Sequence, residues 1–268
     1  PGMDITQILI QHKLRLDFPN EVNEEVNRIP MQVSPTDLEN RKDYRNQIVV
    51  TIDGEDAKDF DDAISIQRLN NGYKLDVHIA DVSYYIHEKS ALDTEARERG
   101  TSVYVVDRVV PMLPHALSNG ICSLMEAVDR LTLTCSMELD YGGNVINYDI
   151  HPSIIRSSKR MTYTKVNEVL DGKVSDEYKP YAEMILLMDE CAQRIRYKRE
   201  EKGAINFNSV ESKFILDKQR EVIDIKARIQ DDAEMLIEDF MVSANEVVAK
   251  HLKWLDVPAL YRVHDAPD

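Results

Sequence analysis

Six carboxylates crowd into residues 53–62 of this chain, between two runs of apolar residues. They are Asp53, Glu55, Asp56, Asp59, Asp61 and Asp62. Like charges a few ångströms apart repel, and proteins respond by protonating some of the groups or by binding a cation. The stretch contains no His or Cys, so its oxygen ligands suit Mg²⁺ or Mn²⁺ better than Zn²⁺. This spacing favours a divalent-metal site.

Three other interpretations of the acidic stretch compete with the metal site. Many acidic turns are simply solvated, and an Asp-x-Asp-Asp string alone does not exclude this. An EF-hand loop is excluded because Gly at its sixth position and Glu at its twelfth are absent. A phosphatase-type nucleophile is disfavoured, since Asp53 is followed by Gly54 and Glu55 and the usual Asp-x-Asp pair is missing.

Predicted strands must position these carboxylates. Residues 48–52 read as a buried strand that ends at Asp53, and residues 63–69 alternate as the next strand before a reversal into 73–81. If the second strand begins early enough, Asp59 and Asp61 share one face and Asp62 points to the other. Together with Asp53, the group could serve two metal positions.

The order Asp53, five residues, then Asp59-Phe60-Asp61-Asp62 resembles the signature of the ribonuclease II / ribonuclease R family of processive 3′-to-5′ exoribonucleases. Further segments resemble the same RNB catalytic domain, in order: 78–86, 99–104, 110–114, 117–124, 129–132, 160–163 and 236–246. The bacterial ribonuclease R branch is the most similar. Because the matches run from about residue 45 to the end of the chain, they are far more specific than any single motif.

The resemblance implies four metal-site aspartates, Asp53, Asp59, Asp61 and Asp62, with Asp61 indispensable for chemistry. Two metals could activate the attacking water and stabilise the leaving 3′ oxygen. The implied cofactor is Mg²⁺, with Mn²⁺ as the alternative. Glu55 and Asp56 match no family residue, and we expect them to be solvent-facing acids of the loop.

The resemblance also implies four substrate-binding side chains. Tyr104 matches the ring that stacks on the 3′-terminal base, and Phe207 a second ring on the other side. Such stacking tolerates any base and contributes roughly 1–3 kcal/mol per base. Tyr163 and Glu238 are expected near the scissile end. Core packing is the alternative for each ring, and a helix-surface acid next to Asp239 is the alternative for Glu238.

Composition and charge set further limits. With 268 residues, 43% of them hydrophobic, the chain can bury a core in one large domain. We expect a connector over residues 1–46 and the catalytic domain over 47–268, incomplete at its C-terminal end. A net charge of −15 opposes non-specific RNA binding. Basic clusters within 156–165 and 194–202 could form a positive path, with an ordinary solvated face as the equal alternative.

Cysteine usage and hydropathy bear on the compartment. Cys122, Cys135 and Cys191 are odd in number and far apart, which argues against disulfides and predicts a reducing cytoplasm. No apolar run is long enough for a transmembrane helix, so no membrane partner is expected. The histidines, His78 and His151 among them, are expected to be structural.

The predicted fold class is mixed α+β, with a twisted, largely antiparallel sheet covered by helices. Helices are expected over 35–45, 90–100, 165–170, 180–201 and 232–255, and further strands over 132–139, 145–153, 207–217 and 221–228. Residues 107–124, which contain Pro111 and Pro114, are predicted to form a loop.

Three functions follow as hypotheses. The first is a Mg²⁺-dependent 3′-to-5′ exoribonuclease that digests single-stranded RNA to nucleoside 5′-monophosphates, with no DNA substrate and with a monomeric intact protein. The second is a catalytically incomplete fragment that binds metal and RNA. The third is another metal-dependent phosphohydrolase acting on small phosphates.

Overall fold

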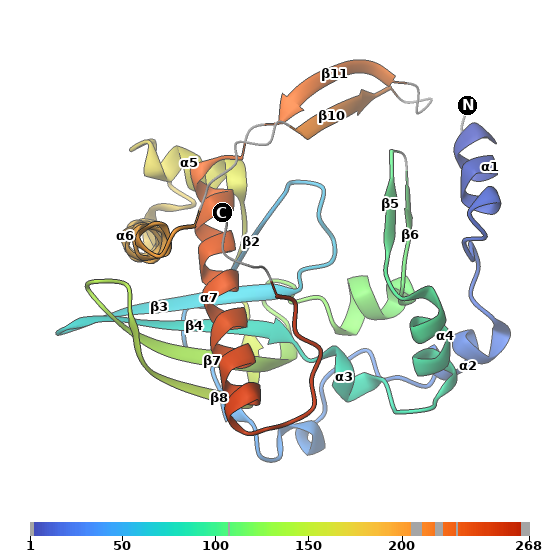
Figure 1. Cartoon of the computed structure of the whole chain (residues 1–268), viewed down its shortest axis with the longest axis horizontal. Coiled ribbons are helices and arrows are strands. Elements are labelled where there is room, and N and C mark those ends of the chain that lie inside the picture. Colours follow the sequence, from blue (N-terminus) through green and yellow to red (C-terminus); the bar gives the residue numbers. More distant parts are fainter. Residues whose placement is uncertain (1–2, 107, 205–210, 218–221, 229, 264–268) are drawn as a thin grey trace. The chain divides into compact units, whose positions relative to one another are not determined.

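The computed structural model describes residues 3–106, 108–204, 211–217, 222–228 and 230–263 (Figure 1). The chain divides into two compact units, each built from segments that are distant in sequence. Unit 1 comprises residues 1–32, 81–123 and 208–229, and unit 2 comprises residues 33–80, 124–207 and 230–268. In the described part of the chain, every helix is too short or too polar to cross a membrane.

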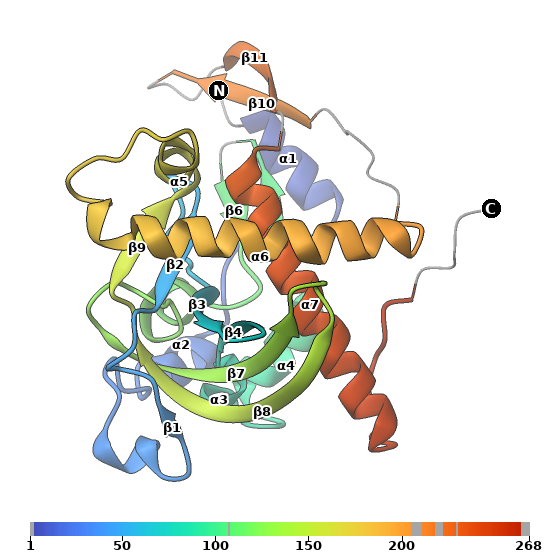
Figure 2. The ribbon, with the colours of Figure 1, turned by 90° about the vertical axis from the view of Figure 1, so that its left-hand side faces the viewer.

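Unit 2 contains a seven-stranded sheet in the order β1-β8-β7-β4-β3-β2-β9. Its strands are β1 (Lys42–Asp43), β2 (Val50–Asp53), β3 (Asp62–Leu69), β4 (Gly72–Ala80), β7 (Asp129–Asp140), β8 (Val145–Arg156) and β9 (Lys159–Thr162). The inner pairs are antiparallel, whereas β1 on β8 and β9 on β2 are parallel. The predicted mixed α+β class with a largely antiparallel sheet is confirmed. β7 and β8 bend strongly (Figure 2).

The turn between β3 and β4 requires glycine. A β carbon at Gly72 would lie 1.8 Å from the carbonyl oxygen of Leu139 on the neighbouring strand β7, closer than atoms can approach. The tight turn keeps the two strands in continuous register from Asp62 opposite Ile79 to Leu69 opposite Gly72. This register places the first residue of β3 beside the end of β4.

Three helices cover one face of this sheet: α5 (Tyr163–Leu170), α6 (Ala182–Glu201) and α7 (Asp232–Trp254). Figure 2 shows α6 and α7 crossing in front of the strands. One face of α6 is apolar and buried, with Ile185, Met188, Cys191, Ala192 and Ile195. They pack in one core with Leu75 and Val77 of β4 and Phe240 of α7. Each fully buried Ile, Leu, Val, Met or Phe side chain contributes roughly 1.5–3 kcal/mol.

The opposite face of β4 carries buried polar residues, because successive side chains of a strand alternate. Asp76 and His78 are both fully buried, and Nδ1 of His78 lies 2.6 Å from Oγ1 of Thr134. Burial lowers the pKa of His78 to about 3, so the ring is neutral. The environment of His78 agrees with its predicted structural role.

Unit 1 consists of short helices and hairpins. They are α1 (Met3–Gln11), α2 (Asn20–Val26), α3 (Val82–Tyr85), α4 (Ala91–Arg99), a π-helix (Leu117–Ile121), and the hairpins β5 (Val103–Val105) with β6 (Arg108–Val110) and β10 (Glu211–Leu216) with β11 (Val222–Arg228). The helix predicted over 90–100 is confirmed as α4: Oγ of Ser90 accepts a hydrogen bond from the Asp93 N–H at its start, and the helix ends at Gly100 with φ of 72°.

Two sequence predictions are wrong. The helix expected over 35–45 is only a single 3₁₀ turn (Pro35–Leu38), because β1 follows and pairs with β8. The loop expected over 107–124 contains β6 and the π-helix. Strand β9 was not predicted either, since a four-residue strand gives little periodicity and depends on its neighbour β2.

Candidate metal centre

The four predicted aspartates lie at the junction of β2 and β3 in unit 2. Asp53 is the last residue of β2 and Asp62 the first of β3. The residues between them, 54–61, are called the acidic loop here. Asp59 and Asp61 lie in this loop, so the shared strand face considered above does not form, because β3 begins only at Asp62.

Backbone hydrogen bonds anchor the C-terminal end of the acidic loop. The carbonyl of Phe60 accepts from the Leu124 N–H at 2.9 Å, and the carbonyl of Asp61 accepts from the Ala80 N–H at 2.9 Å. The Phe60 side chain is buried, at 6% exposure. Asp59 and Asp61 therefore flank a residue that is fixed both by its ring and by its backbone.

The carboxylates interact through their charges. Burial, and then the charges of Asp62 and Asp61, raise the pKa of Asp53 to about 7. Burial and the charge of Asp61 raise the pKa of Asp62 to about 6. The pKa of Asp61, the most exposed of these three, is raised by partial burial and by the charge of Asp59. The negative charges are thus concentrated and poorly compensated.

Such a group fits a hard divalent cation. A cation would favour the ionised carboxylates, and all of the available donors are oxygens, as Mg²⁺ and Mn²⁺ prefer. Within the described residues, no three carboxylate, imidazole or thiol side chains already surround one point as metal ligands. Metal ligation by Asp53, Asp59, Asp61 and Asp62 therefore stays a prediction.

The predicted stacking residues lie in different surroundings. Tyr104 lies in the β5–β6 hairpin of unit 1, opposite Val109, and its side chain is 70% exposed. Core packing, the alternative for this ring, is therefore excluded, and base stacking stays a prediction. Phe207 lies outside the described residues.

Tyr163 and Glu238 belong to unit 2. Tyr163 is the first residue of α5 and packs, partly buried, against the core. Glu238 is exposed on α7, where its Oε2 accepts a hydrogen bond of 2.6 Å from Nε2 of Gln230. Its exposure suits a helix-surface acid, and proximity to a scissile bond remains a prediction.

The neighbour of Glu238 is the buried acid of this helix. Asp239 is 2% exposed, and its two oxygens accept hydrogen bonds from Nε of Arg196 at 2.9 Å and from Nη1 of Arg199 at 2.7 Å. Burial raises the pKa of Asp239 despite both partners. This link between α6 and α7 was not predicted from the sequence. The spacing of Arg196 and Arg199, three residues apart on one helix, was a signal for it.

The predicted basic clusters are largely neutralised by the protein's own carboxylates. In the first cluster Arg156 pairs with Asp129, Lys159 with Glu177, and Lys165 with Glu168. In the second, Arg196 and Arg199 share Asp239, and Lys198 pairs with Glu201. For these residues the structure favours the solvated, ion-paired face over a positive path.

Comparison with known proteins agrees with this fold and this order of motifs. A family model described as "RNB domain" matches residues 41–268. The chain is 51% identical to ribonuclease R of Thermotoga maritima, over 100% of the chain and 38% of that protein. It is 46% identical to ribonuclease R 1 of Lactococcus lactis, over 99% of the chain and 33% of that protein.

A solved structure shows the same likeness in three dimensions. Mycoplasma genitalium RNase R in complex with ribose methylated single-stranded RNA superimposes with a TM-score of 0.93 at 30% identity, covering 98% of this chain and 41% of the other. The chain thus spans less than half the length of the relatives it matches. Because the family model covers most of it, the chain belongs to the RNB domain family.

Proposed function

We propose that the protein containing this chain is a divalent-metal-dependent exoribonuclease that degrades single-stranded RNA from its 3′ end to nucleoside 5′-monophosphates. One observation carries the proposal: partly buried, mutually repelling carboxylates at a strand junction, with the pKa of Asp53 raised to about 7 and that of Asp62 to about 6. The chain that holds them is 51% identical to a protein named ribonuclease R.

Each group has a role in this proposal. Asp53, Asp59, Asp61 and Asp62 would hold the cations, with Mg²⁺ proposed as the natural metal and Mn²⁺ as a substitute. Bound cations would supply a nucleophilic water at neutral pH and stabilise charge on the leaving 3′ oxygen. The hydrogen bonds from Leu124 and Ala80 keep the backbone at the Phe60–Asp61 end of the loop in place. The exposed Tyr104 ring would stack on the terminal base.

The proposed RNA partner rests on the relatives. Mycoplasma genitalium RNase R has been solved with single-stranded and with double-stranded RNA. We therefore expect RNA, and not DNA, to be the substrate of the protein containing this chain. A reducing cytoplasm is proposed separately, on the ground of the buried free thiols of Cys122, Cys135 and Cys191. A monomeric intact protein stays an expectation.

A time course with 5′-labelled single-stranded RNA tests the proposal in the full-length protein. With Mg²⁺ we expect stepwise shortening from the 3′ end, and none in EDTA. Asp61→Asn should slow cleavage at least about 10³-fold while RNA binding is kept, because the carboxylate would hold a cation that acts on the reacting atoms. Asp56→Asn, an exposed acid of the same loop, is the matched control. Full cleavage by Asp61→Asn would remove that residue from the mechanism.

A second candidate is that this chain alone binds metal and RNA without cleaving. The fraction of the relatives that it spans, 38% and 33%, favours it, because active-site walls could lie in the remainder. The same assay on this chain and on the full-length protein separates the two. Cleavage by the longer protein only would assign the missing activity to residues outside this chain.

A further inference from the structure

We infer that Arg160, which has no assigned role, is a positioning residue that holds both ends of the acidic loop and so sets the spacing of its aspartates. The effect of Arg160 on catalysis rests on the proposed function, whereas the contacts of Arg160 do not depend on it. Arg160 lies in β9, beside Thr51 of the parallel strand β2. The strand that carries the arginine is therefore paired with the strand that leads into the loop.

The first end of the loop is held by hydrogen bonds. Nη2 of Arg160 donates to the carbonyl of Glu55 at 2.7 Å and to that of Gly54 at 3.2 Å. Hydrogen bonds from a charged donor are stronger than neutral ones. The Gly54 carbonyl also accepts from the Ala57 N–H at 3.2 Å, which closes a turn at the point where the chain leaves Asp53.

The second end is held through an aromatic ring. The guanidinium carbon of Arg160 lies 5.2 Å from the ring centroid of Phe60, within the range of a cation–π interaction. Phe60 stands between Asp59 and Asp61. The Arg160 side chain thus contacts both the residues that follow Asp53 and the ring between Asp59 and Asp61, so movement of either end of the loop must disturb these contacts.

The backbone of Arg160 is itself fixed. Its N–H donates to Oε2 of Glu126 at 2.9 Å, while β9 pairs with β2 from Lys159 to Thr162. A lysine could not reproduce all of the side-chain contacts, because an ammonium has no planar face to lie against the Phe60 ring. The hydrogen bonds to the two carbonyls both come from Nη2, so a lysine could replace them in part.

Arg160 also differs from its basic neighbours in how its charge is used. Arg156, Lys159 and Lys165 each form an ion pair with a carboxylate. Within the described residues Arg160 forms no such pair, and its charge opposes the rise in the pKa of Asp53. The geometry, rather than this charge effect, carries the inference.

Direct binding of an RNA phosphate is the competing role for an arginine near this site. Nε of Arg160 is buried and has no hydrogen-bond partner among the described residues, so a phosphate could not reach it without rearrangement. Nη2 is already occupied by two carbonyls. These contacts favour an action through the loop over an action on the substrate.

The test uses Arg160→Met and Arg160→Lys in the full-length protein. Amide hydrogen exchange over residues 54–61 is measured first, and we expect it to rise about 10-fold or more in Arg160→Met. Binding of Mn²⁺, followed by electron paramagnetic resonance, should weaken in parallel. The kcat for RNA should fall about 100-fold with little change in KM, as for displaced catalytic groups. Arg160→Lys should show smaller changes than Arg160→Met in the exchange rate, in Mn²⁺ binding and in kcat, but it should not reach the values of the unmodified protein.

Arg68→Met is the matched control. Arg68 also lies near a ring, 5.8 Å from that of Tyr73, and it donates to Glu190, but it lies on β3 away from the loop. We expect it to leave exchange in the acidic loop unchanged. If Arg160→Met unfolds the protein, Phe60→Leu, which removes the ring and keeps a buried side chain, tests the second contact with the same readouts.

Two outcomes would overturn the inference. Unchanged exchange in the acidic loop of Arg160→Met would show that the arginine does not hold it. A rise in KM alone, with kcat and Mn²⁺ binding unchanged, would assign Arg160 to RNA contact. Failure of the proposed function is distinguishable, because an unmodified protein that cleaves no RNA still gives loop exchange rates and Mn²⁺ affinities to compare.

Discussion

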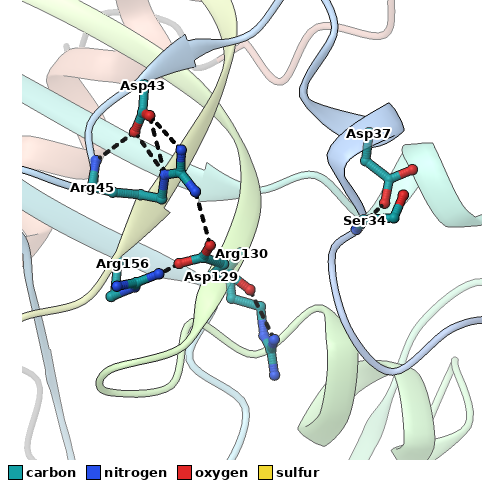
Figure 3. A network of polar contacts seen from close by, with 7 residues as sticks. All are labelled: Ser34, Asp37, Asp43, Arg45, Asp129, Arg130 and Arg156. Carbon is teal, nitrogen blue, oxygen red and sulfur yellow. Dashed lines mark hydrogen bonds and ion pairs between the residues drawn. The ribbon is translucent and has the colours of Figure 1, made fainter.

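Carboxylates occur in two contrasting settings in unit 2. In the acidic loop, aspartates lie beside one another. In a second group, which we call the arginine network, Asp43 and Asp129 alternate with Arg45 and Arg156 (Figure 3). There, Arg45 donates to both oxygens of Asp43 and reaches Asp129 at 3.1 Å, and Arg156 donates to Asp129 at 2.6 Å.

The two groups shift carboxyl pKa values in opposite directions. The hydrogen bond from Arg45 lowers the pKa of Asp43, and hydrogen bonds from Arg156 and Arg45 lower that of Asp129 although burial opposes them. At the start of the acidic loop the pKa of Asp53 rises to about 7, although the charge of Arg160 opposes the rise. The arginine network thus stabilises the fold, whereas the acidic loop and the aspartates that flank it hold charge that the fold compensates only in part. A bound cation can neutralise negative charge of this kind.

The largest expected effect is on the pH dependence of stability. In EDTA, the raised pKa values of Asp53 and Asp62 mean that the folded state binds protons more tightly than the unfolded chain. The free energy of unfolding should therefore fall as pH rises from about 4 to 7, by at most about 4 kcal/mol for Asp53. Urea unfolding at several pH values from 4 to 8 measures it.

Asp53→Asn should flatten that dependence, because the amide does not titrate. The arginine network contributes with the opposite sign: its stability is present above pH 4 and is lost as pH falls further, through the lowered pKa values of Asp43 and Asp129. If the free energy of unfolding fell equally with pH between 4 and 7 in Asp53→Asn and in the unmodified protein, the contrast between the two groups of carboxylates would be contradicted.

The next largest effect concerns divalent cations. Mg²⁺ or Mn²⁺ at about 100 times its Kd should raise the free energy of unfolding by about 2.7 kcal/mol, because only the folded state brings the aspartates together. Asp62→Asn should lose most of this gain, and Asp129→Asn should keep it. Thermal melts with and without the metal give the comparison, and equal gains in both variants would place the cation elsewhere.

A smaller effect is expected when the arginine network is broken. Asp129→Asn should lower the free energy of unfolding by about 2 kcal/mol, because Arg45 and Arg156 each lose a charged acceptor in a partly buried position. Asp171→Asn is the control, since its pair with Lys173 is more than half exposed on both sides. A cost for Asp129→Asn no greater than for the control would show that the network does not stabilise the fold.

The smallest effect on stability is expected at Tyr104. Its side chain is 70% exposed, so Tyr104→Ala should change the free energy of unfolding by less than about 0.5 kcal/mol. Like the aspartates of the acidic loop, Tyr104 should affect the substrate and not the stability of the fold. The length of the final RNA product should therefore change in Tyr104→Ala. An unchanged product would leave Tyr104 without a role in stacking.

The sequence predicted most long elements of this fold. Strands β3, β4, β7 and β8 and helices α6 and α7 followed from periodicity, because each buries one face over many residues. The short elements did not follow. The helix expected over 35–45 was wrong, since pairing of β1 with β8 outweighs the local helical signal, and β9 exists only because β2 lies next to it.

By itself, the sequence determined the aspartate spacing, the family and the strand junction at which Asp53 and Asp62 stand, because these depend on order along the chain. Only the tertiary structure decided which carboxylates are compensated. Asp129 finds its arginines and Asp239 finds Arg196 and Arg199 through contacts between distant segments, and Arg160 reaches Gly54, Glu55 and Phe60 across a parallel strand pair. Charge compensation depends on distances of a few ångströms, which packing sets.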